Sequence, residues 1–179
     1  MYFLFVENGI INGSSDLDQR DIDTPDRFQV EVSEEVYNSY MQDKDRYIYL
    51  DGEIVENPNY QKIKANERKA EFENKFIQTP WGWYRKQPKG YANAPQSIDI
   101  ICNIVNASGG FTEQVADMML FYQQPDFNNP EECTEEWLIK HQYKHEPCST
   151  QEFMQFYIAF QTAWAKDQYK ANSEPPDVV

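Results

Sequence analysis

The chain has 179 residues, of which 40% are hydrophobic and 15% aromatic, and its formal net charge is −14. This length allows one domain or two small ones, and the aromatic content is sufficient for a usable core. No stretch approaches the ~20 apolar residues of a membrane-spanning helix, so we expect no membrane insertion. The opening MYFLFVENG is too short for a signal-peptide core and lacks a basic lead-in, which predicts a protein made in a cytoplasm.

Acidic and basic side chains are unevenly distributed along the chain. Residues 1–56 contain 4 basic and 14 acidic side chains, residues 57–94 contain 8 and 3, and residues 95–179 contain 4 and 13. A duplex nucleic-acid partner is not expected, because most of the surface would repel phosphates. The basic middle segment is either a solvated helix or a surface that meets acidic groups of this chain or a neighbour.

The first 32 residues predict strands and a tight turn. The apolar run at 2–6 is typical of a buried strand, and Asn8-Gly9 after it predicts a hairpin because both residues tolerate positive φ. Residues 12–27 are rich in Gly, Ser, Asp and Pro and predict a loop. Residues 28–32 alternate apolar and polar side chains, which predicts a half-buried strand with Gln29 on the polar side.

A short helix and a second hairpin complete this first module. Ser33 is expected to cap the helix, whose first turn carries two glutamates that suit the positive helix end. Asp51-Gly52 lies between two short strand-like segments and predicts another tight turn. A module of this size is expected to be only marginally stable by itself.

A polar helix and an irregular segment follow. Asn57-Pro58 suits a helix start, and residues 60–77 contain no Gly or Pro but only a thin apolar stripe, so we expect a helix that needs a neighbour. Residues 79–95, TPWGWYRKQPKGYANAP, contain three prolines and two glycines, which predicts a break in regular structure.

The remainder predicts helices. Residues 98–105 place apolar side chains on one face before Gly109, which suits a left-handed helix stop. Thr112 and Thr134 are expected to cap two further helices, the first extending to Pro125. Ser149 and Glu152 have the spacing of a capping box and open the most amphipathic helix, with apolar side chains at 153, 156, 157, 160 and 164.

These elements predict an α+β protein. We expect a strand-rich module with two tight hairpins at 1–57, a connecting helix and aromatic–basic segment at 58–94, a mainly helical domain at 95–170, and a disordered tail at 171–179.

Both histidines and two of the three cysteines lie close together in sequence. Cys133, His141, His145 and Cys148 are types of residue that bind zinc, but their spacing is not that of a standard zinc finger. The same residues would be needed for a Cys–His nucleophile, but the sequence does not indicate a third group that would orient the histidine. The sequence therefore predicts no catalytic residue, no metal site and no cofactor, and leaves the zinc site as an alternative.

An aromatic and basic cluster is the strongest candidate for partner binding. Trp81, Trp83, Tyr84, Arg85 and Tyr91 lie within eleven residues. Such side chains could stack on sugars or single-stranded bases, but they more often pack between subdomains or form the centre of a protein interface.

The first 60-odd residues resemble a recurring pattern in small proteins encoded beside the tail genes of tailed bacteriophages and prophages. The matching segments are MYFLFVENGIINGSS, FQVEVSEEVYNSY, RYIYLDGEIVENPNY and the charged helix after them. The resemblance covers about a third of the chain and implies a tail-fibre, baseplate or tail-tip accessory component, without catalysis and without any individually assigned functional residue.

The functional expectation is a non-enzymatic tail structural or assembly protein that is assembled in the host cytoplasm and located in the virion tail. Its expected partners are other virion tail proteins, with self-association left open. An alternative is a phage-encoded acidic inhibitor or effector that binds a host protein, because an acidic surface suits a target that normally holds nucleic acid.

Overall fold

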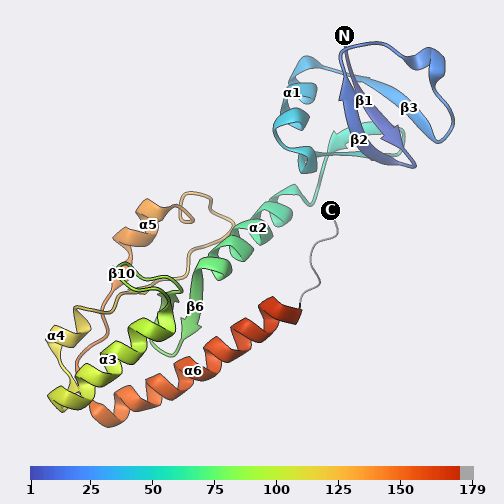
Figure 1. Ribbon diagram of the computed structural model, residues 1–179. Coiled ribbons are helices and arrows are strands. Elements are labelled where there is room, and N and C mark those ends of the chain that lie inside the picture. Colours follow the sequence, from blue (N-terminus) through green and yellow to red (C-terminus); the bar gives the residue numbers. More distant parts are fainter. Residues whose placement is uncertain (174–179) are drawn as a thin grey trace. The chain divides into compact units, whose positions relative to one another are not determined.

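The computed structural model describes residues 1–173, which divide into two compact units, Met1–Lys64 and the described residues from Ala65 onwards. The boundary lies inside helix α2 (Tyr60–Lys75), so the first unit extends past residue 57 and includes the start of this helix. The expected α+β class, with strands and hairpins first and helices later, is confirmed (Figure 1). Residues 171–173 end the last helix, and the rest of the expected disordered tail lies outside the described residues.

The first unit contains two small antiparallel sheets and a helix. A three-stranded sheet has the order β2-β1-β3, and β4 and β5 form a separate hairpin. In chain order its complete elements are β1 (Tyr2–Glu7), β2 (Ile10–Ser15), the 3-10 turn η1 (Arg20–Ile22), β3 (Arg27–Val32), α1 (Glu34–Gln42), the 3-10 turn η2 (Lys44–Arg46), β4 (Tyr47–Leu50) and β5 (Glu53–Glu56).

Both predicted hairpin turns of this unit are confirmed. Asn8 and Asp51 each have φ near +52°, and the glycine after each also has positive φ, which matches the twist of two antiparallel strands. The strand β1 lies at the centre of its sheet, and Phe3, Leu4 and Val6 are fully buried there. Because neighbouring side chains point to opposite faces of a strand, both faces of this sheet must be covered.

Helix α1 contributes to one face of the sheet and begins as predicted. The Ser33 hydroxyl accepts a hydrogen bond of 3.2 Å from the Val36 amide, which satisfies one of the unpaired amides of the first turn. Tyr37 of this helix packs its ring 4.7 Å from that of Tyr2 in β1.

The second unit is built around a four-stranded antiparallel sheet of order β10-β9-β7-β6. A further pair of two-residue strands, β8 and β11, joins the ends of two helices. After α2, its elements are β6 (Phe76–Thr79), β7 (Gly82–Arg85), α3 (Ala94–Ser108), β8 (Gly110–Phe111), α4 (Glu113–Ala116), β9 (Phe121–Tyr122), α5 (Glu135–Lys140), β10 (Gln142–Tyr143), β11 (Cys148–Ser149) and α6 (Thr150–Ser173).

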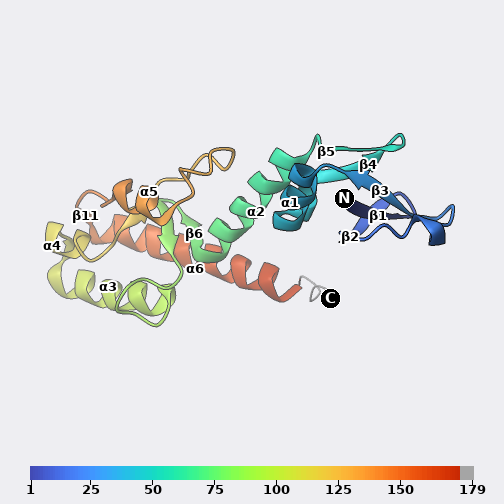
Figure 2. The ribbon, with the colours of Figure 1, turned by 90° about the horizontal axis from the view of Figure 1, so that it is seen from above.

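Helices cover both faces of this sheet, so the second unit has three layers. Helices α3 and α6 lie side by side against one face, as Figures 1 and 2 show, and the core between them and the sheet is rich in phenylalanine. A smaller cluster on the other face joins Phe72 of α2 and Leu138 of α5 to Phe76 and Tyr122 of the sheet. Alternate residues of each strand therefore enter different cores.

The sheet corrects three sequence predictions. The segment 79–95, expected to break regular structure, contains β7, and two expected helices end early. The helix expected over 60–77 ends at Lys75, because Phe76 and Ile77 enter β6 and bury their side chains on opposite faces of the sheet. The helix expected from Thr112 to Pro125 ends at Ala116, and the chain then reaches β9. In both places, strand pairing prevails over local helical spacing: β6 pairs with β7 in a tight hairpin, and β9 pairs with β7 and β10.

The start of α6 confirms the predicted capping box. The Ser149 amide donates to the Glu152 carboxylate at 3.0 Å, and the Glu152 amide donates to the Ser149 hydroxyl at 3.2 Å. Phe153, Phe156 and Phe160 on this helix are buried against the sheet.

Candidate functional site

The five residues predicted to bind a partner do not form one exposed cluster. Trp81 lies in the turn between β6 and β7, and its ring stacks between those of His145 and Phe156, with centroid distances of 3.8 and 4.1 Å. The next residue, Gly82, has φ of +125°, and a Cβ atom there would lie 2.0 Å from the Tyr143 hydroxyl oxygen. Trp81 is therefore a packing residue of the second unit.

The next three predicted residues alternate between the two faces of β7. Tyr84 is buried on the α3–α6 side, where its hydroxyl lies 2.5 Å from that of Ser97. Burial is the main cause that raises the pKa of Tyr84 to about 12, so this hydroxyl stays neutral near neutral pH. Trp83 and Arg85 point to the other face, where Trp83 contacts the ring of Phe72 at 5.0 Å.

Arg85 reaches the edge of that second cluster. Its guanidinium carbon lies 4.7 Å from the ring centre of Phe76 and 5.1 Å from that of Tyr122, and a nitrogen of the same group pairs with the Glu135 carboxylate. Arg85 thus lies between buried rings and the surface.

The four candidate zinc ligands are not brought together. Helix α5 ends at Lys140, so His141 and His145 do not lie on one helix face. His141 stacks on Trp137, and His145 stacks on Trp81. Within residues 1–173, no group of three or more His, Cys, Asp or Glu side chains is arranged to hold a metal ion.

The cysteines also lack the features of a nucleophile. Cys102, Cys133 and Cys148 are all free thiols in the second unit, and burial is the main cause that raises the pKa of each. An activated cysteine requires the opposite shift, towards the thiolate at neutral pH.

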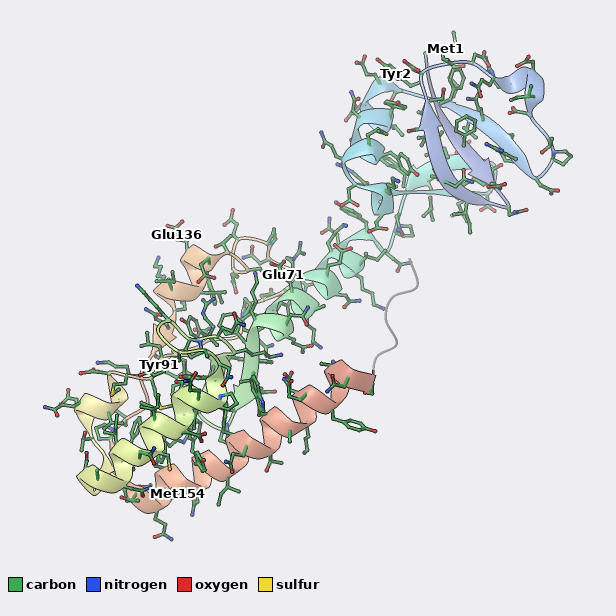
Figure 3. The ribbon with its side chains drawn as sticks, viewed as in Figure 1. Met1, Tyr2, Glu71, Tyr91, Glu136 and Met154 are labelled. Carbon is green, nitrogen blue, oxygen red and sulfur yellow. The ribbon has the colours of Figure 1, made fainter. Side chains whose placement is uncertain are left out.

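The best candidate for a contact site is a surface groove of about 560 Å³ beside α5, which we call the α5 groove. It is formed by the segment after β7, by the segment between α4 and β9, and by α5 itself. Three predicted contact residues line it: Tyr84, Arg85, and Tyr91, which Figure 3 labels in the segment before α3.

Three aliphatic side chains give the α5 groove an apolar surface. Met118, Leu120 and Ile139 line it and are 41%, 37% and 51% exposed. Lys89 also lines the groove, and no ion-pair partner is found for it among the described residues. The groove thus combines exposed apolar surface with one uncompensated positive charge.

Sequence reasoning missed the aliphatic part of this site. Met118 lies within the stretch for which the sequence predicts a helix to Pro125, but α4 ends at Ala116, so the exposure of Met118 does not follow from helical spacing. A signal was present at Ile139, because Trp137, Leu138 and Ile139 are consecutive in a short helix. A short surface helix buries only one side, so at least one of these three apolar side chains is expected to face solvent.

Comparisons of the chain with protein-family models, with curated proteins and with solved structures give no match. Among residues 1–173, none of the helices is both long enough and apolar enough to cross a membrane.

Proposed function

We propose that this protein is a non-enzymatic structural or assembly component of a bacteriophage tail, such as a tail-fibre or baseplate accessory protein, that docks onto other virion tail proteins. The observation that carries the docking role is the α5 groove, in which three aliphatic side chains are exposed together. Contiguous apolar surface on a soluble protein commonly marks a protein contact. The tail assignment rests on the resemblance of the first 60-odd residues to tail-associated proteins.

The size of the groove indicates what kind of contact it supports. Full burial of an aliphatic side chain contributes about 1.5–3 kcal/mol, so covering three that are 37–51% exposed contributes roughly 2–4 kcal/mol. A micromolar complex needs about 8 kcal/mol. The groove alone therefore gives weak docking, which suits an assembly in which many copies or several contacts act together.

The experiment is to purify virions and to measure whether the protein remains with the particles. We compare the wild type with the double variant Met118→Gln/Ile139→Gln and with the control Ile158→Gln. Ile158 is 61% exposed on α6, outside the groove. We expect the wild type and the control to copurify with tails and the groove variant to be lost from them.

Absence of the wild-type protein from particles, with the protein abundant in infected cells, would contradict the proposal. That result would favour an acidic inhibitor of a host protein instead. Circular dichroism of each variant establishes that its loss from particles does not reflect unfolding.

A further inference from the structure

The first unit presents an acidic loop with two exposed aliphatic side chains. Residues 16–26, which we call the acidic loop, contain five aspartates and one arginine. Within it, Leu17 and Ile22 are 62% and 69% exposed. Because these two apolar side chains are exposed, a role in the core of the first unit does not account for them.

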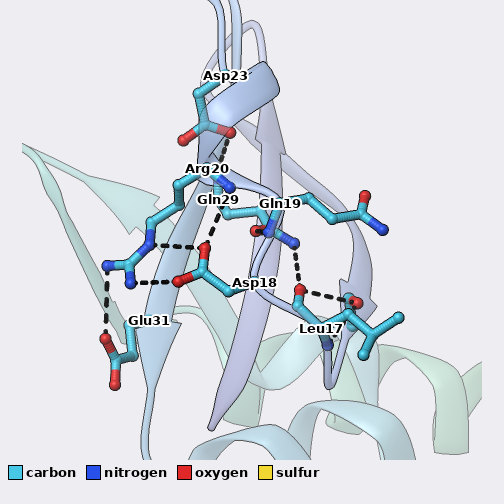
Figure 4. A network of polar contacts seen from close by, with 8 residues as sticks. Leu17, Asp18, Gln19, Arg20, Asp23, Gln29 and Glu31 are labelled. Atoms are coloured by element: carbon cyan, nitrogen blue, oxygen red, sulfur yellow. Dashed lines mark hydrogen bonds and ion pairs between the residues drawn. The ribbon is translucent and has the colours of Figure 1, made fainter.

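A buried glutamine holds this loop in place, as Figure 4 shows. Gln29 of β3 is 5% exposed, although its position in the strand predicts a solvent-facing side chain. Its side-chain oxygen accepts a hydrogen bond of 2.6 Å from the Gln19 amide, and its side-chain nitrogen donates one of 3.1 Å to the Leu17 carbonyl. Its own backbone amide donates to the Asp23 carboxylate at 3.0 Å.

An ion pair inside the loop adds to this order. Arg20 contacts the Asp18 carboxylate at 2.5 Å, and its guanidinium carbon lies 5.2 Å from the ring centre of Phe3 in the sheet. The hydrogen bonds from Arg20 lower the pKa of Asp18 to about 2. The loop is therefore ordered before it meets a partner, which reduces the entropy lost on binding.

The acidic loop and the α5 groove are complementary in chemistry. The loop offers two aliphatic side chains among exposed carboxylates such as Asp16 and Asp21. The groove offers exposed aliphatic side chains beside Lys89. Opposite charges at the edge of an apolar contact favour encounter and fix its register.

We propose that the acidic loop of one copy of this chain occupies the α5 groove of a second copy. This inference rests on the proposed function and names the partner of the same groove. Leu17 and Ile22 contact Met118, Leu120 and Ile139 of the other copy, and Asp21 lies near its Lys89. Because the two surfaces differ, the association is head-to-tail, and copies add until a ring closes or a filament grows.

Sedimentation velocity of the whole chain over a range of concentrations is the first test. We expect oligomers whose proportion rises with protein concentration. Lys89→Glu and Asp21→Lys should each weaken association about tenfold, and mixing these two variants should restore a contact between them. Met41→Gln serves as control, since Met41 is 54% exposed in the first unit outside the loop.

A mixing experiment distinguishes head-to-tail association from any symmetric contact. The loop variant Leu17→Gln/Ile22→Gln keeps a working groove, and the groove variant Met118→Gln/Ile139→Gln keeps a working loop. Each alone should be monomeric, and a mixture should stop at the dimer, because only one productive contact remains. Assembly of the mixture beyond the dimer would contradict the proposed geometry.

The two proposals fail separately. A wild-type protein that stays monomeric up to ~1 mM, the scale of a very weak complex, would overturn self-association, even if it remained on purified tails. A protein that oligomerises as described but is absent from particles would overturn the tail assignment while leaving the loop–groove contact in place.

Discussion

Replacement of Trp81 by alanine should destabilise the second unit strongly. The indole stacks on His145 and Phe156, and each stacked pair contributes about 0.5–1.5 kcal/mol beyond the area that it buries. Truncation of a core tryptophan to alanine usually costs about 3–5 kcal/mol. Because Trp81 is only partly buried, we expect a loss near the lower end, about 3 kcal/mol in the free energy of unfolding.

Urea unfolding followed by tryptophan fluorescence measures this loss specifically in the second unit of the chain. All four tryptophans of the chain lie in the second unit, so the three that remain report its unfolding. The matched control is Tyr169→Ala, because Tyr169 is an aromatic residue of α6 that is 77% exposed, and its replacement should change stability by less than ~0.5 kcal/mol.

A loss below about 1 kcal/mol for Trp81→Ala would refute the reasoning. It would mean that the stacked rings do not support the unit, and Trp81 would again be a candidate contact residue. The expected result also means that Trp81 variants cannot test partner binding, since a destabilised unit would lose binding indirectly.

Three other predictions concern a buried hydrogen bond, a turn and a loop. Ser97→Ala leaves the Tyr84 hydroxyl buried without its partner and should cost about 1–3 kcal/mol in urea unfolding, whereas addition of Tyr84→Phe should restore part of that loss; equal effects of the single and double variants would argue against the bond. Gly82→Ala should lower the thermal midpoint markedly because its φ is +125° and the added methyl has no space; a midpoint within 1–2 °C of wild type would contradict this, since ~1 kcal/mol shifts such a unit by several degrees. The lowered pKa of Asp18 means that its ion pair is complete above about pH 4 and is lost as the pH falls towards 2. Carboxyl NMR should therefore find a midpoint near 2, which returns towards the usual 3.8 in Arg20→Gln; a wild-type midpoint at the usual value would show that the pair does not form.

Turns and helix starts could be read from the sequence because their causes are local. Asn8-Gly9 and Asp51-Gly52 need positive φ, and Ser33 and Ser149 satisfy unpaired helix amides within three residues. The residues that determine each turn or helix start are neighbours in the sequence, so a local pattern is sufficient to predict it.

The second sheet and the contact groove depend on residues distant in sequence. Residues 76 and 77 continue a helix-like segment without Gly or Pro. They form a strand by pairing with β7, which is itself held in the sheet by β9 from a distant part of the sequence. Gln29 looks exposed by alternation, but the acidic loop folds over it and supplies a donor and an acceptor. The exposure of Ile139 likewise depends on which of its neighbours α5 buries.

The distribution of the free thiols makes the two units separately observable. All three cysteines belong to the second unit and the first has none, so a thiol reagent modifies only the second unit. Cys102 lies in α3 inside the phenylalanine-rich core, whereas Cys133 and Cys148 are partly accessible. The rate at which Cys102 is labelled thus measures how often that core opens, and peptides of the unlabelled first unit provide an internal reference in the same mass spectrum.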